Sequence, residues 1–337
     1  MAHIQTVLGP VDAAGVTGIL PHEHLLSLTP GGWLSGGGTS DEDQVTTAVG
    51  ALRGLRELGI DTVVDLSPYG VVGRDVDGAN VTLLRRIAEL SGLHVVTGTA
   101  VYLESFSPAW ARDATLSEMT RRLVDDATVG IGGSTITAGV LGEQATSLGR
   151  ITPHEEKCLR ASARAHRETG LALCTHTTHG TMALEQIEIL RQERVLLDRV
   201  VIGHVDTHPD TDYVRTILAT GVMIAFDTIG KQHWDFRVDP IDPDQPDGAY
   251  RKDAYKRADH TRADRIATLV AAGFVDQILL SHDLTGSEVY LNPDTHGFWG
   301  YSYLARRFTP MLRDRGVTQP QLDTMTRTNP TRMLTIQ

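Results

Sequence analysis

The chain has 337 residues, of which 41% are hydrophobic and 22% are charged, and this composition excludes wholesale disorder. Its formal net charge of −11 argues against a broad surface for nucleic acid or anionic membranes, because both need clustered cations. The two cysteines, Cys158 and Cys174, make no disulfide framework. Since no signal peptide and no membrane-spanning run is visible, we expect a cytoplasmic protein with a small-molecule substrate.

Short apolar, β-branched runs alternate with amphipathic helical stretches along the chain. The runs that we expect as strands are Thr17–Pro21, Asp61–Leu66, His94–Ala100, Thr137–Glu143, Leu171–His176, Arg199–His204, Gly221–Asp227 and Gln277–Asp283. The expected helices between them include Thr46–Leu58, Asn80–Ser91, Leu116–Ala127, Pro153–Thr169, Thr181–Glu193, Asp210–Ala219 and Arg262–Gly273. This alternation predicts parallel strands joined by right-handed crossovers.

A single α/β domain, a (β/α)8 TIM barrel over residues 1–337, accounts for the number of strands and the length. An open doubly wound sheet is the alternative, but its Gly-x-Gly-x-x-Gly turn is absent after the first strand. Two connections, 27–43 after the first strand and 231–260 after the seventh, are long and rich in Gly, Pro and Asp. Because both leave the carboxyl ends of strands, we expect them to form rim loops that wall a pocket.

Residues that bind metals recur at the carboxyl ends of the predicted strands. The first strand leads into Pro21-His22-Glu23-His24, and alternation along a strand puts both histidines on one face. An isolated pair of this kind is a weak signal. Four other strand ends add Glu143, His176, His204 and Asp283. In a barrel these ends meet at one rim, and unpaired buried carboxylates there would be costly, so we predict a metal site.

Six protein ligands exceed what one catalytic zinc ion with an open position uses, so we expect two cations. The expected division is His22, His24 and Asp283 on one ion, His176 and His204 on the other, and Glu143 as the bridge. Imidazole with carboxylate suits Zn²⁺, Mn²⁺, Co²⁺ or Ni²⁺, and Zn²⁺ is the leading interpretation. Because a two-metal centre lowers the pKa of a shared water, the pattern indicates a hydrolase.

A series of motifs runs in order along nearly the whole chain. They are LPHEH at 20–24, VVDLS at 63–67, GRDV at 73–76, ITAGVLGE at 136–143, TPHEEKCLRASARAHRETG at 152–170, CTHT at 174–177, VIGHVD at 201–206, ILLSHD at 278–283 and TNPTRML at 328–334. With these motifs the chain resembles the phosphotriesterase-related proteins of the amidohydrolase superfamily, including their lactonase branches. The resemblance implies a (β/α)8 barrel with a binuclear metal centre, and its ligand pattern matches the histidines above and Asp283.

Three positions bear on the resemblance. The fourth-strand bridge of the family is often a carboxylated lysine, whereas Glu143 stands at that place here. Phosphotriesterases carry a relay histidine just after the seventh-strand aspartate, but Thr228 follows Asp227 in this chain, which weakens the triester interpretation. Tyr102 follows the third strand, where lactonase-like members often have a tyrosine over the substrate carbonyl.

The resemblance implies that a metal-bridging hydroxide cleaves a carboxylic ester, with a lactone as the leading interpretation. Asp283 is then expected to act as general acid/base as well as ligand, and Tyr102 to donate a hydrogen bond to the substrate oxygen. Phosphotriester or phosphoester hydrolysis and amide or carbamate hydrolysis remain alternatives. A ligand-binding barrel that kept the fold without catalysis is the alternative outside the enzymes.

Residues near the expected rim suggest two kinds of substrate. Lys231 stands directly after the seventh strand, where a cation could bind an anionic group. Trp33, Trp234 and Trp299 lie in the expected rim loops, where aromatic rings could line an apolar pocket. The first feature favours a charged substrate tail and the second an acyl or aromatic one. A homodimer is the common arrangement for such barrels.

Overall fold

A computed structural model describes residues 2–28, 40–231, 233–238, 252–285 and 300–336. Eight parallel strands form one sheet in the order β12-β9-β8-β7-β6-β5-β4-β3. The strands are β3 (Ile19–Glu23), β4 (Thr62–Asp65), β5 (His94–Thr99), β6 (Val140–Thr146), β7 (Leu173–Thr177), β8 (Val200–Ile202), β9 (Met223–Phe226) and β12 (Ile278–Leu280). Each overlaps one of the eight runs expected from the sequence.

The two edges of this sheet meet through Ser281, which directly follows β12. Its hydroxyl donates to the carbonyl oxygen of His22 in β3 at 3.0 Å, and the amide of His22 lies 3.0 Å from the same hydroxyl oxygen. The amide of Asp283 also donates to the carbonyl of His22, at 3.1 Å. These bonds bring the first and last strands together, so the eight strands make a nearly closed TIM barrel, as predicted.

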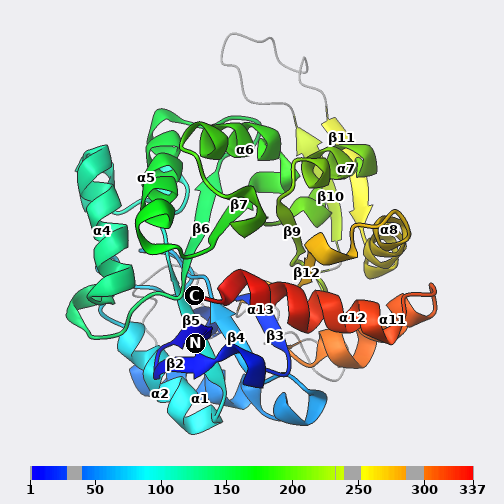
Figure 1. Ribbon diagram of the computed structural model, residues 1–337, viewed down its shortest axis with the longest axis horizontal. Helices are drawn as coiled ribbons and strands as arrows, with labels where there is room; N and C mark the ends of the chain where they lie inside the picture. Colours follow the sequence, from blue (N-terminus) through cyan, green and yellow to red (C-terminus); the bar gives the residue numbers. More distant parts are fainter. Residues whose placement is uncertain (1, 29–39, 232, 239–251, 286–299, 337) are drawn as a thin grey trace.

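Helices surround the strands on the outside (Figure 1). They are α1 (Asp41–Leu52), α2 (Val81–Ser91), α3 (Ala109–Asp113), α4 (Leu116–Thr128), α5 (Pro153–Thr169), α6 (Ala183–Gln192), α7 (Thr211–Ala219), α8 (Asp259–Ala271), α11 (Thr309–Arg313), α12 (Gln319–Asp323) and α13 (Asn329–Leu334). Local chemistry sets the ends of α5. Thr152 and Glu155 form a capping box at the first turn, and Gly170 ends the helix in the left-handed conformation.

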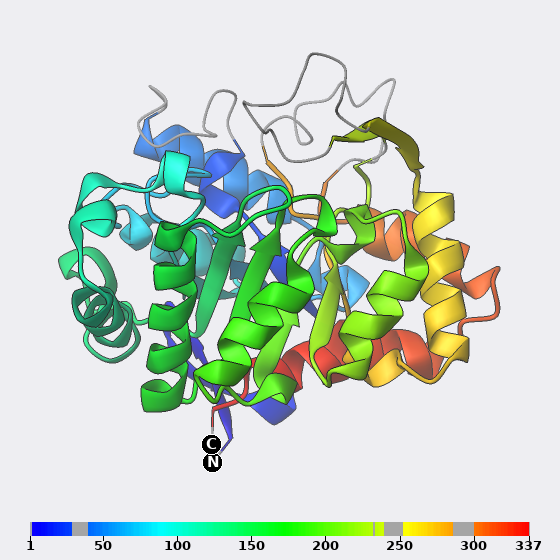
Figure 2. The same cartoon turned by 90° about the horizontal axis from the view of Figure 1, so that it is seen from above.

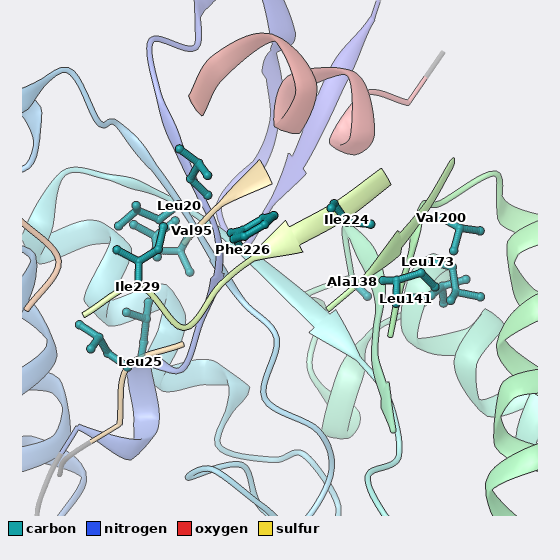
Figure 3. Packing of buried hydrophobic residues seen from close by; sticks show 14 of the residues in the cluster. Leu20, Leu25, Val95, Ala138, Leu141, Leu173, Val200, Ile224, Phe226 and Ile229 are labelled. Carbon is teal, nitrogen blue, oxygen red and sulfur yellow. The ribbon is translucent and has the colours of Figure 1, made fainter. Parts of the chain in front are cut away.

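Alternation along the strands divides the core into two layers. Leu20, Val95 and Phe226 face the helices and pack into one large cluster (Figure 3). Their neighbours in sequence point the other way: Ile19 and Val96 belong to a second cluster inside the barrel. Cys174 packs in this inner cluster, as expected, and both cysteines are free thiols. Strands buried on both faces are typical of a parallel barrel.

The connection after β9 is not a simple loop, which corrects the expectation for 231–260. It contains β10 (His233–Val238) and β11 (Lys252–Arg257), which pair in antiparallel fashion. The physical reason is the period-2 alternation of HWDFRV, a strand signal within a segment rich in Pro and Asp. This ribbon projects at the end of the barrel opposite to the two termini (Figure 2).

The hairpin of β1 (His3–Thr6) and β2 (Gly9–Asp12) comes before the barrel strands in the chain and was not expected from the sequence. His3 pairs with Ile336, so the hairpin ties the start of the chain to its end. Among the described residues, no helix combines the length and apolar character that crossing a membrane requires.

Candidate metal centre

The six predicted ligands converge at the carboxyl ends of the strands around the carboxylate of Glu143. The Nε2 atoms of His22 and His204 lie 3.4 and 3.3 Å from Glu143 Oε2. His24 Nε2 lies 3.5 Å from the other oxygen, and His176 Nδ1 lies 3.2 Å from Oε2. Glu143 therefore occupies the centre of the cluster, although it comes from the fourth barrel strand and the histidines come from three others.

Asp283 completes the cluster from the end of β12. Its Oδ1 atom lies 2.9 Å from Nε2 of His24 and 3.9 Å from Nε2 of His22. Among the described residues, three groups of ligand atoms are each close enough to hold one cation: His22, His24 and Asp283; Glu143, His176 and His204; and His22, His204 and Asp227. The first two groups contain the same residues as the division expected from the sequence, and Glu143 also lies near His22 and His24 of the first group.

The residues fit a binuclear metal site on physical grounds. Their side chains are largely buried, with exposures of 4% for His22, 3% for Glu143 and 17% for Asp283. Nε2 of His22 is buried without a hydrogen-bond partner in the structure, which would be costly unless it binds an ion. Imidazole and carboxylate donors together suit a divalent transition metal.

Asp227, directly after β9, orients two of the histidines, although no role was expected for it from the sequence. Its Oδ2 accepts from Nδ1 of His22 at 2.7 Å, and its Oδ1 accepts from Nδ1 of His204 at 2.9 Å. Because a carboxylate only accepts, both Nδ1 atoms carry a proton, which would leave both Nε2 atoms as the ligand atoms once a cation displaces their protons. The strand-end pattern that identified the ligands could also have identified Asp227.

Glu23 binds the backbone next to Asp283 on the side away from the cluster. It was assigned no role from the sequence. Alternation puts it on the face of β3 opposite to His22, and it is fully buried. Its carboxylate accepts from Nδ1 and the amide of His282 at 2.8 and 3.0 Å, and from the amide of Leu284 at 3.1 Å. These bonds flank Asp283 on both sides in sequence and therefore hold the backbone that presents it.

The charges in the cluster shift the pKa values of its members. Burial alone would lower the pKa of His204, but Asp227 and Glu143 outweigh burial and raise it to about 10. Burial likewise opposes the charged form of His22, yet Glu143 and Asp227 raise its pKa well above the usual value. The pKa of Glu143 is held well below its usual value, because His22 and the other histidines offset the effect of burial.

His176 differs from its two neighbours. Burial, together with the nearby imidazole of His204, lowers its pKa. The pKa of Asp283 lies well below its ordinary value, since Lys231 and His24 overcome the burial that would raise it. The cluster therefore holds ionised carboxylates next to imidazoles, which is the protonation pattern from which a cation displaces protons.

Tyr102 and Lys231 both reach the cluster. The hydroxyl of Tyr102 lies 3.3 Å from Nε2 of His176, and the two rings meet edge to face. Burial, with Glu143 and Asp283 nearby, raises the pKa of Tyr102 well above its usual value, so the hydroxyl keeps its proton. Nζ of Lys231 lies 2.6 Å from Oδ2 of Asp283, on the oxygen turned away from His24.

The three predicted tryptophan contacts are not tested by the structure. Trp33 and Trp299 lie outside the described residues. Trp234 belongs to β10, where its backbone is in register with Lys256, but its side chain lies outside the described part. The relay position of phosphotriesterases is described: the hydroxyl of Thr228 contacts Asp206 and Arg262.

Comparison with known proteins places this fold and cluster in a family. The profile described as "Phosphotriesterase family" matches residues 2–334. The chain belongs to the phosphotriesterase family. It is a hydrolase of that family, and its buried His, Asp and Glu side chains form clusters that are consistent with binding of two cations.

Relatives within the family carry different activities in their names. The phosphotriesterase homology protein of Escherichia coli strain K12 is 30% identical over 288 residues, which cover 86% of this chain and 88% of the relative. The N-acetyltaurine hydrolase of Salmo salar is 27% identical over 363 residues, covering 99% of this chain and 98% of the relative.

Two solved structures match the barrel closely. A crystal structure of the Escherichia coli phosphotriesterase homology protein, complexed with phosphate in its active site, has a TM-score of 0.76 at 29% identity and covers 95% of this chain and 99% of that one. A mutant of a PTE-like lactonase from Deinococcus radiodurans has a TM-score of 0.80 at 30% identity, covering 98% of this chain and 99% of that one.

Proposed function

We propose that this protein is a binuclear metal-dependent hydrolase that opens a lactone or a related carboxylic ester. The observation that carries the proposal is the hydroxyl of Tyr102, which lies at the cluster, 3.3 Å from Nε2 of His176. A protonated phenol at this place can donate a hydrogen bond to a carbonyl oxygen as negative charge develops on it. The likeness to a PTE-like lactonase supports the same choice.

Two cations would be held by the six residues of the cluster, with Zn²⁺ as the leading candidate. When bound, they would lower the pKa of a water between them and polarise the carbonyl of the substrate. The protein supplies the fixed orientation. Asp227 sets the tautomers of His22 and His204, and Glu143 lies between the two ligand groups.

Asp283 is the proposed general acid/base. Its Oδ1 faces His24 within the cluster, while its Oδ2 accepts from Lys231 at 2.6 Å. A carboxylate with one oxygen in the ligand cluster and the other at its edge can take a proton from the attacking water and return it to the leaving oxygen. The low pKa of Asp283 keeps its carboxylate ionised near neutral pH, so both of its oxygens are acceptors.

Lys231 is the proposed contact for the variable part of the substrate. Its side chain is 14% exposed, so it borders the cluster without being sealed from solvent. An ammonium at the rim would favour a substrate with a carboxylate, sulfonate or phosphate tail. Trp33, Trp234 and Trp299 remain proposed apolar contacts for the rest of the substrate.

The test is an assay of metal-loaded protein against γ- and δ-lactones and an organophosphate triester, followed with a pH indicator because each releases a proton, and against N-acetyltaurine, followed by detection of the free amine. Metal content is measured on the same samples, and two ions per chain are expected. The proposal predicts that lactone opening has the highest kcat/KM of the panel. Two bound ions with no turnover of any ester or amide would instead favour a ligand-binding barrel.

Amide hydrolysis is the second candidate, and one observation favours it. N-acetyltaurine hydrolases are relatives over nearly the whole length of this chain, and taurine carries a sulfonate that Lys231 could bind. The chemistry up to the tetrahedral intermediate is the same for an amide and an ester. Faster cleavage of N-acetyltaurine than of every lactone would establish this alternative and exclude the first.

A further inference from the structure

A second buried group of charged residues lies directly beside the metal centre. We call it the Arg262 cluster; it consists of Asp206, Thr228, Asp259, Arg262 and Tyr303. Arg262 is 2% exposed, Asp206 is 5% exposed and Asp259 is fully buried. Placing an arginine and two carboxylates in the interior is costly unless their hydrogen bonds are well satisfied. Such a cluster is a poor way to gain stability alone, which points to a role in precise placement.

The guanidinium of Arg262 joins parts of the chain that are far apart in sequence. Its Nε donates to Asp206 at 2.7 Å, and Asp206 lies two residues after the ligand His204. Its Nη1 donates to Asp259 in α8 at 2.9 Å. Its Nη2 donates both to the hydroxyl of Thr228 at 2.7 Å and to the carbonyl oxygen of Lys231 at 2.9 Å.

The segment 228–231 is thereby held at both ends. Its middle is held too, because the amide of Gly230 donates to Asp259 at 3.1 Å. Asp259 is itself fixed by the hydroxyl of Tyr303, which donates to its second oxygen at 2.6 Å. The segment therefore has little freedom between Asp227, which orients the histidines, and Lys231, whose side chain reaches Asp283.

We propose that Arg262 is a positioning residue for substrate recognition. It fixes the backbone of 228–231 so that Lys231 reaches the rim of the metal centre at one place. The role of Lys231 toward a substrate anion rests on the function proposed above. Only a planar guanidinium presents donors on several sides in a rigid fork, so lysine at this position would satisfy only part of the acceptor set.

The first test measures the backbone directly and does not depend on the substrate. Hydrogen–deuterium exchange of the 228–231 amides is compared between the wild type, Arg262→Lys and Thr228→Val. Thr228→Val keeps the charged pairs intact, so it guards against a variant that fails to fold. We expect exchange to rise by about 10-fold or more in this segment, with the other barrel strands unchanged. Unchanged exchange in both variants would overturn the proposal.

Arg265→Met is the matched control. Arg265 lies one turn further along α8 and donates to the carbonyl oxygens of His208 and Pro209 at 2.6 and 2.9 Å. Arg265 is half-buried, less so than Arg262, and it contacts backbone carbonyls of the segment after β8, including a longer contact of 3.4 Å to the carbonyl oxygen of Asp206. This variant is expected to leave exchange at 228–231 as in the wild type. If exchange at 228–231 rises as much in Arg265→Met as in Arg262→Lys, then loss of any arginine from α8 loosens the segment, and Arg262 has no specific role there.

The second test separates positioning from general stability. A neutral δ-lactone is compared with the same ring carrying a carboxylate, using metal-loaded Arg262→Lys and Lys231→Met. We expect both variants to raise KM for the charged lactone about 10-fold more than KM for the neutral lactone. Because Lys231 also contacts Asp283, any change in kcat of Lys231→Met should be the same for the two lactones. An equal loss on both lactones in Arg262→Lys would assign it a structural role only and overturn the proposal.

The same comparison shows where a failure lies. If Lys231→Met does not distinguish the two lactones, the error is in the proposed substrate chemistry of Lys231. In that event the exchange of 228–231 decides by itself whether Arg262 positions the segment.

Discussion

Asp227 binds His204 twice through one oxygen atom, Oδ1. It accepts from the backbone amide of His204 at 2.9 Å and from the imidazole Nδ1 of the same residue at 2.9 Å. His204 has a left-handed backbone, with φ of 58°, which is strained for a residue with a side chain. The carboxylate therefore stabilises both the unusual backbone and the ring orientation of this candidate ligand, and removing it should loosen both.

Asp227→Asn is accordingly expected to weaken metal binding. An asparagine side chain cannot accept from both imidazoles while keeping the negative charge that balances them. Loss of such an orienting partner lowers metal affinity by about 10- to 100-fold. Titration against a chelator of known affinity measures this change. Asp126→Asn is the control, because Asp126 is a buried carboxylate that binds Tyr69 and Thr99 instead. Equal metal affinity in both variants would contradict the role of Asp227.

Asp283→Asn tests the general acid/base. If Asp283 moves the proton, turnover should fall by about 10²- to 10⁴-fold, because an amide cannot accept it. Metal content must be measured on the same sample, since Asp283 also belongs to a ligand group. Full metal occupancy together with undiminished turnover would exclude the base assignment.

Tyr102→Phe tests the hydrogen bond to the substrate oxygen. We expect kcat to fall by roughly 10- to 100-fold with a smaller change in KM, because the donor acts on charge that develops in the transition state. Tyr69→Phe is the matched control, since its hydroxyl donates to Asp126 away from the cluster. A Tyr102→Phe enzyme with wild-type kcat would show that the ring only packs at the rim.

Metal binding should depend on pH in a direction that the pKa shifts determine. In the metal-free protein the pKa of His204 is raised from 6.5 to about 10, so its ion pairs stabilise the fold fully below pH 6.5. That contribution is lost as the pH rises toward 10. A cation needs the neutral imidazole, so its affinity increases over the same range.

The melting temperatures of metal-loaded and chelated protein should therefore diverge as the pH rises from 6.5 to 9. Binding of the cations to the folded state raises its stability by mass action, and the metal-free form becomes less stable at the same time. Paired thermal scans at fixed free metal concentration measure the difference. A difference that stays constant or shrinks with rising pH would mean that the histidines do not exchange protons for metal.

The convergence of the six candidate ligands was predictable because it depends on local rules. Alternation along a strand fixes that His22 and His24 share a face, and the barrel brings every strand end to one rim. The same alternation placed Cys174 in the inner core, where the structure has it. The ribbon of β10 and β11 was wrongly treated as loop, because Pro and Asp in the segment hid a short period-2 signal.

Which partner each side chain has was decided only by the tertiary structure. Asp227 and His22 are 205 positions apart, and Glu23 and His282 are 259 apart, yet both pairs are in contact. Arg262 lies on a helix, where a charged residue ordinarily faces solvent, but here it is buried against Asp206, which is 56 positions earlier in the chain. Spacing along the chain carries no information about such contacts. They arise because closure of the barrel brings segments that are distant in sequence within a few ångströms of one another. Their buried polar groups must then form hydrogen bonds with each other, because water is excluded.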